Sequence, residues 1–176
     1  MKIIITTLSI SLILTSCIGA GNMSRRETIP TGANTDMVFC SDKTTLRTHN
    51  IVDDPNVINA QNKNITFCKA IIAADIFNAI EDSSIECLED FNKKKSLIGL
   101  ISDDVIKRNI DKSLVIYDKT TKSNDNIYKS EVVVELKKSI ILDELKASFI
   151  KGNIADSAKI AEVISATNKR LIPIEK

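Results

Sequence analysis

The segment SLVIYDKTTKSNDNIYKSEVVVE, residues 113–135, separates two alternatives for the fold class. Its apolar runs at 114–117 and 132–134 are rich in β-branched residues, and the polar residues between them could join two strands into a hairpin. The same apolar residues also continue a spacing of three and four that is typical of one helix face. We therefore predict a mainly α fold, a small helical bundle, with an α+β fold carrying a hairpin near 113–135 as the alternative.

Upstream of this segment, apolar residues recur at helical spacing in three stretches. Asn64 can cap the first helix, and Ser83 opens a capping-box pattern for the second. Ser102 precedes two acidic residues that suit the positive end of a third helix. The apolar rows are Ile65, Cys68, Ile72, Ile76, Ala79 and Ile80, then Ile85, Leu88 and Phe91, then Ile106, Ile110, Leu114 and Tyr117. Residues 37–63 show no such period, apart from a turn at 53–56.

Downstream of a polar break at 122–126, two more helices are predicted. The first carries Val132, Leu136, Ile140, Leu145 and Phe149. Gly152 should end it, because glycine accepts the left-handed conformation that follows many helices. Asn153 can then cap a last helix, which should end before Pro173.

The composition is that of one folded domain without a bias toward nucleic acid. The chain has 176 residues, of which 43% are hydrophobic and 27% charged, which excludes wholesale disorder. Its formal net charge is +1, whereas proteins that neutralise phosphates normally show a basic excess. We therefore expect no nucleic-acid partner.

The N-terminus has the parts of a bacterial export signal in order. Lys2 provides a positive charge, residues 3–14 are mostly apolar, and LTSC follows at 14–17. The apolar stretch is shorter than the roughly 20 residues that span a bilayer. The LTSC sequence resembles the lipobox of bacterial lipoproteins. This resemblance implies that signal peptidase cleaves between Ser16 and Cys17, and that Cys17 receives a diacylglycerol thioether and an amide-linked acyl chain.

Such acyl chains would hold the protein at a membrane without a spanning helix. Each buried methylene contributes about 0.8 kcal/mol, and two or more chains are needed for stable attachment. We therefore expect a signal peptide at 1–16, the lipidated cysteine and a flexible tether at 17–36, and a single globular helical domain at 37–176. Ile18 is not an acidic retention residue, so the resemblance implies passage to the outer membrane, with surface display as a further expectation.

Three further cysteines, Cys40, Cys68 and Cys87, lie in the predicted domain. An odd number allows one intrachain disulfide at most. Core packing of reduced thiols, a Cys40–Cys68 or Cys68–Cys87 bridge, and an intermolecular bridge remain alternatives. Their spacing lacks the close pairs of a zinc site, so we expect no metal.

The sequence contains no recognisable catalytic or cofactor motif. Its one histidine, His49, lies in a polar setting that we interpret as surface. Glycine loops for phosphate and nucleophile motifs are missing from the sequence. The lysines at 93–95 and the carboxylates of Glu86, Glu89 and Asp90 are interpreted as solvated helix faces. We therefore expect no catalytic residue, no cofactor and no enzyme activity.

The overall plan favours a protein that acts by binding. A lipobox, a tether and a helix-rich domain resemble, in layout only, the small helical surface lipoproteins of spirochaetes, several of which bind host proteins or glycans. The resemblance implies a surface or envelope lipoprotein with a macromolecular partner, but no ligand residue transfers to this chain. The alternative is a periplasm-facing structural or assembly lipoprotein that binds another envelope protein. The sequence does not predict the oligomeric state.

Overall fold

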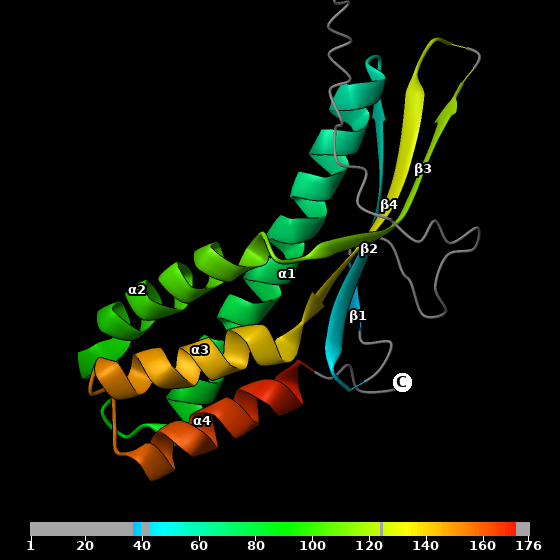
Figure 1. Cartoon of the computed structure of the whole chain (residues 1–176). Helices are drawn as coiled ribbons and strands as arrows, with labels where there is room; N and C mark the ends of the chain where they lie inside the picture. Colours follow the sequence, from blue (N-terminus) through cyan, green and yellow to red (C-terminus); the bar gives the residue numbers. More distant parts are fainter. Residues whose placement is uncertain (1–36, 40–42, 124, 172–176) are drawn as a thin grey trace, which may run out of the picture.

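The computed structural model describes residues 37–39, 43–123 and 125–171 (Figure 1). The predicted signal peptide, Cys17, the tether and Cys40 lie outside these residues. In the described part the order of elements is β1 (Met37–Phe39), β2 (Thr45–Asp54), α1 (Val57–Cys87), α2 (Phe91–Ile110), β3 (Leu114–Lys122), β4 (Tyr128–Lys137), α3 (Lys138–Lys151) and α4 (Ser157–Arg170).

The strands form an antiparallel sheet in the order β1-β2-β4-β3. β3 and β4 are the hairpin of the alternative α+β prediction, with Leu114 opposite Glu135, Lys122 opposite Tyr128 and an irregularity between Val115 and Tyr117. The fold is therefore mainly α with a small antiparallel sheet. The prediction of helices through 114–117 and 132–136 is wrong.

Burial of both faces of β4 explains why its pattern was ambiguous. β4 lies between β2 and β3, and Val132, Val133 and Val134 are all fully buried. A strand buried on both faces has a continuous apolar run instead of an alternating one, and such a run also fits helical spacing. The β-branched composition was the better guide here, because such side chains pack well on a pleated sheet.

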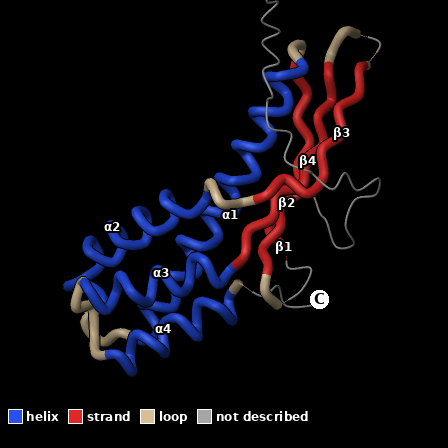
Figure 2. The backbone as a smooth tube through the Cα atoms, in the orientation of Figure 1, coloured by secondary structure: helices blue, strands red, loops and turns tan. Residues whose placement is uncertain are grey.

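The long helix α1 connects the sheet to the other helices (Figure 2). Its 31 residues extend over about 46 Å, and it contacts β2 and β4 as well as α2 and α4. Asn56 caps it by accepting hydrogen bonds from the backbone amides of Ile58 and Asn59. The predicted cap at Asn64 is therefore wrong, and so is the helix start at Ser83, because both residues are buried within α1.

Asn64 instead joins α1 to the sheet. Its side-chain amide is fully buried and donates hydrogen bonds to the carbonyl oxygens of Asn50 in β2, at 3.0 Å, and Ser130 in β4, at 2.8 Å. An amide in the apolar stripe of a helix is favourable only when its polar atoms find partners. Here the sheet provides them.

The remaining helix boundaries also differ from the predicted ones. α2 continues through Ser102, whose hydroxyl donates to the carbonyl of Ile98 one turn earlier. α3 ends at Lys151 with Gly152 as its C-cap, but the left-handed residue is Asn153, with φ 50°. Asp156, not Asn153, caps α4 by accepting from the backbone amide of Lys159 at 2.8 Å. α4 ends at Arg170, as predicted before Pro173.

One apolar core runs from the sheet into the helices. α1 contributes to it from Ile65 to Cys87, and α2, α3 and α4 close around the C-terminal half of this helix (Figure 1). The largest fully buried side chains are Phe149, Leu46, Ile72, Ile76, Ile80, Leu136, Ile141, Leu145, Ile154 and Ile160. This packing fixes the relative positions of α3 and α4, between which a cavity lies.

Candidate functional site

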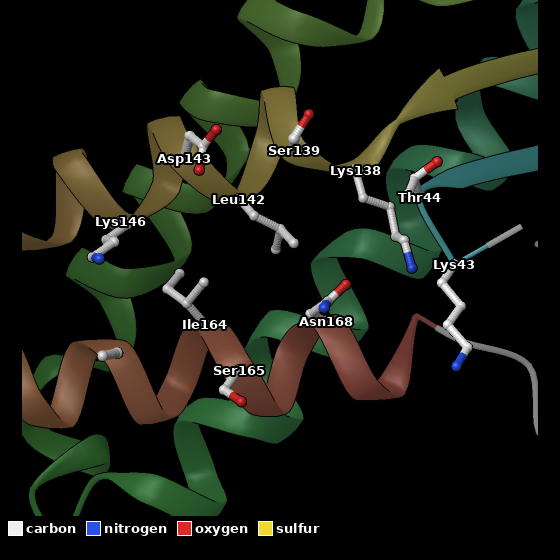
Figure 3. A pocket seen from close by; sticks show the side chains of 11 residues that line it. Lys43, Thr44, Lys138, Ser139, Leu142, Asp143, Lys146, Ile164, Ser165 and Asn168 are labelled. Carbon is white, nitrogen blue, oxygen red and sulfur yellow. The ribbon is translucent and has the colours of Figure 1, made fainter.

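A cavity of about 410 Å³ opens between α3 and α4 beside the start of β2 (Figure 3). We call it the α3–α4 pocket. Its lining residues are Lys43, Thr44, Lys138, Ser139, Leu142, Asp143, Lys146, Ala161, Ile164, Ser165 and Asn168. Its volume lies in the range of about 300–1,000 Å³ that is typical of small-molecule sites. The second described cavity, beside Phe77 and Phe91, has only about 50 Å³.

Lys138 is placed in this pocket by the direct passage from β4 into α3. It is the first residue of α3, immediately after the last residue of β4. Its backbone amide donates to the carbonyl of Thr44 at 3.0 Å, which joins the start of α3 to the turn before β2. The side chain then extends toward Asn168 of α4, into the space between the two helices (Figure 3).

The ammonium group of Lys138 has no hydrogen-bond partner within the described chain. The residue is only 2% exposed, and its Nζ atom is buried. Burying a charge is unfavourable unless it is paired, and lysine is almost never fully buried without a partner. The position of Lys138 therefore favours a role in binding a ligand over a role in stabilising the fold.

The lining combines positive charge with an apolar wall. Lys43 and Lys146 add two exposed cations, against the single carboxylate of Asp143, so the lining contains three lysines and one acid. The first turn of α3 adds the positive end of a helix dipole, and its N-cap residue makes no side-chain capping bond. Leu142 and Ile164 provide apolar surface between the charged ends (Figure 3). This combination can bind an anionic group attached to an apolar body.

His49 was predicted on the surface, but the structure buries it. It is 5% exposed, and its Nε2 lies 3.1 Å from Oε1 of Glu131 across β2 and β4. The other oxygen of Glu131 accepts a hydrogen bond of 3.2 Å from the hydroxyl of Tyr117. Burial and the neighbouring carboxylate of Glu131 raise the pKa of Tyr117. Neither cavity described above is lined by His49, so this cluster cross-links the strands instead of lining a pocket.

The charged groups that were interpreted as solvated faces form ion pairs near the helix ends. Lys94 pairs with Asp90 at 2.8 Å and also donates to the carbonyl of Ile154. Glu86 pairs with Arg170 of α4 at 2.6 Å. These contacts make Lys94, Asp90 and Glu86 local cross-links. Lys95 also pairs with an acid of α1, so the lysines at 93–95 do not form a concentrated basic patch.

The two described cysteines cannot bond to each other. Cys68 and Cys87 lie 19 residues apart on the same helix, a rise of about 28 Å, whereas a disulfide requires α-carbons within about 7 Å. The proposed Cys68–Cys87 bridge is therefore wrong. Cys68 is fully buried and Cys87 is half-buried. The Cys40–Cys68 alternative lies partly outside the described residues.

The described residues contain no group of three or more His, Cys, Asp or Glu side chains arranged to hold a metal ion. None of their helices combines the length and the apolar character that a bilayer span requires.

Lys138 was not predicted as a site residue, although the sequence contains one indication of its burial. Counting back from Phe149 through Leu145 and Leu142 in steps of three and four reaches position 138, so a lysine occupies a core position of the helix stripe. A charged residue on an apolar stripe indicates either a buried partner or a ligand. No family model, curated protein or solved structure matches this chain.

Proposed function

We propose that this protein is a lipid-anchored envelope protein that acts by binding a ligand in the α3–α4 pocket, without catalysis. The observation that carries the binding role is the buried ammonium of Lys138, which lines a ligand-sized cavity and has no partner in the described chain. A group of this kind is expected where a ligand completes the charge balance.

The anchor is supported by the N-terminal sequence. The LTSC sequence at 14–17 places Cys17 where a lipobox is modified, after a short apolar signal. Three acyl chains on this cysteine would hold the protein firmly at a bilayer. Residues 18–36 would then act as the tether, and we propose the outer membrane as the destination.

Metabolic labelling with palmitate tests the anchor. The wild-type protein should incorporate label and separate into the detergent phase, whereas Cys17→Ser should do neither. Cys87→Ser is the matched control, because this half-buried cysteine lies in the folded domain and its loss should leave the label in place. An unlabelled wild-type protein, or a labelled Cys17→Ser variant, would refute the anchor.

Protease treatment of intact cells tests on which side the domain lies. Digestion of the domain in intact cells, with a periplasmic marker protected, is the result that we expect from surface display. Full protection would instead place the domain on the periplasmic side, where the alternative role in envelope assembly applies. In-cell crosslinking would then be expected to capture an envelope protein.

A further inference from the structure

We infer that the α3–α4 pocket binds a small amphiphilic anion, with a carboxylate or phosphate group against Lys138 and a short apolar body along Leu142 and Ile164. This inference rests on the proposed binding role and names the chemical class of its ligand. The pocket has three features that select such a ligand: an ammonium without a partner in the described chain, an excess of cations and an apolar wall.

The ammonium of Lys138 determines the sign of the ligand's charge. An acceptor that carries negative charge forms shorter and stronger hydrogen bonds with an ammonium than a neutral acceptor does. Lys43 adds a second cation at the same end of the pocket (Figure 3). A cationic ligand would be repelled there, and a neutral one would leave the buried ammonium without a counter-charge.

Asn168 of α4 adds a hydrogen-bond donor at the end of the pocket where Lys138 lies. Asn168 lines the same pocket as Lys138, and its side-chain amide points toward the space that Lys138 enters (Figure 3). Its amide can donate to an oxygen of an anion, because a side-chain amide has two N–H donors. Carboxylate and phosphate groups both present several acceptor oxygens, so they suit an ammonium and an amide placed together.

The apolar wall determines the rest of the ligand. Leu142 is almost completely buried and Ile164 partly so, and they line the pocket between the end marked by Lys138 and the end marked by Lys146 (Figure 3). Each ligand methylene buried there should strengthen binding a few-fold. A chain of a few carbon atoms should therefore bind better than acetate or inorganic phosphate.

Calorimetric titration of the full chain, kept in a non-ionic detergent, tests this inference. The probes are hexanoate, hexyl phosphate, acetate and inorganic phosphate, with hexylamine and hexanol as the cationic and neutral controls. We expect hexanoate and hexyl phosphate to bind more tightly than acetate and phosphate, and hexylamine not to bind. A free acid and a phosphate ester represent the two sources of the anionic group, so their relative affinities identify the better one.

Substitutions separate the anion site from the fold. Lys138→Met should weaken hexanoate or hexyl phosphate binding by about 10- to 100-fold, the usual effect of losing a hydrogen bond to a charged group. Lys151→Met, in the exposed last turn of the same helix, is the matched control and should leave affinity unchanged. Ala161→Trp, at an exposed lining position, should block the pocket while the melting temperature stays the same.

The stability of Lys138→Met provides a readout that a purely structural lysine would not give. Without an added anion this variant should melt at a higher temperature than the wild type, because it removes a buried, unpartnered ammonium. Adding hexanoate should raise the melting temperature of the wild type only. A lower melting temperature for Lys138→Met in anion-free buffer would show that the ammonium already has a partner within the chain, and would overturn the inference.

Different outcomes distinguish this inference from the proposed function. Hexanol or hexylamine binding that Ala161→Trp blocks and Lys138→Met leaves intact would keep the pocket as a binding site but overturn the anion assignment. Failure of every probe to bind would overturn both the assignment and the pocket. Loss of palmitate labelling with intact hexanoate binding would refute only the anchor.

Discussion

Replacing Asn64 with alanine should be among the most destabilising single changes that the structure predicts. The substitution removes two hydrogen bonds, to the carbonyls of Asn50 and Ser130, from a fully buried site. Each such bond contributes about 1 kcal/mol, and the cavity left by the shorter side chain adds about 1–2 kcal/mol. The free energy of unfolding should therefore fall by about 3–4 kcal/mol, with a melting temperature lower by roughly 6–16 °C.

Chemical denaturation followed by circular dichroism measures this change. Asn62→Ala is the matched control, because Asn62 is an exposed residue of the same helix and alanine favours helices. Asn64→Leu separates hydrogen bonding from volume: it nearly restores the volume but should still be about 1–3 kcal/mol less stable than the wild type. If Asn64→Leu were as stable as the wild type, the view that Asn64 joins α1 to the sheet by hydrogen bonds would be refuted.

Four further predictions concern charge, packing and thiols. A lysine and a backbone amide donate to Asp54 and lower its pKa below the ordinary 3.8, so this carboxylate stabilises the fold above pH 3.8 and loses the effect as the pH falls through the lowered value. Asp54→Asn should therefore be less stable than the wild type in urea melts near pH 7, and the difference should shrink as the pH falls below 3.8. Gly152→Ala should destabilise by about 1–3 kcal/mol, because the added Cβ would lie 2.8 Å from an isoleucine side chain and 3.2 Å from a backbone oxygen. Gly99→Ala, whose Cβ would meet nothing closer than 3.9 Å, should stabilise α2 by about 0.5–1 kcal/mol in the same thermal melts. Burial raises the pKa of Cys87, so mass spectrometry should show slow iodoacetamide labelling near pH 7 that accelerates at higher pH, with fully buried Cys68 protected throughout.

The sequence predicted the helix-rich character and, as the alternative fold, the β3–β4 hairpin, but it did not predict β1 and β2, and β2 shows why. This strand contains Arg47, Thr48, His49 and Asn50, all of them buried. Because buried polar residues do not produce a periodic pattern of apolar residues, the sequence of 37–63 predicts neither a helix nor a strand there. Their partners come from residues far along the chain: Arg47 pairs with Glu135 at 2.5 Å, and His49 lies against Glu131. Pairs between residues more than 80 positions apart cannot be predicted from the pattern of neighbouring residues.

Tertiary packing also explains why the predicted helix starts at Ser83 and Ser102 were wrong. Ser83 and Ser102 carry strong start signals, yet each lies inside a longer helix and donates its hydroxyl to a carbonyl four residues earlier. A serine hydroxyl can satisfy itself in this way within a helix, so the capping pattern alone does not require a boundary. The burial of both residues shows that tertiary packing extended the helices through them.

The position of Lys138 in the pocket could not be predicted from the sequence either. Lys138 follows Lys137, which is exposed, and two adjacent lysines suggest a solvated helix start. What distinguishes them is the direction of β4 as it enters α3, which turns one lysine to solvent and the other between α3 and α4. That direction depends on the β2–β4 pairing, because the turn before β2 accepts the hydrogen bond from the first amide of α3. Because the sequence analysis preferred helices to strands in this region, it could not predict the pocket. It follows that a variant which shifts the register of β4 should alter hexanoate binding even when every residue that lines the pocket is unchanged.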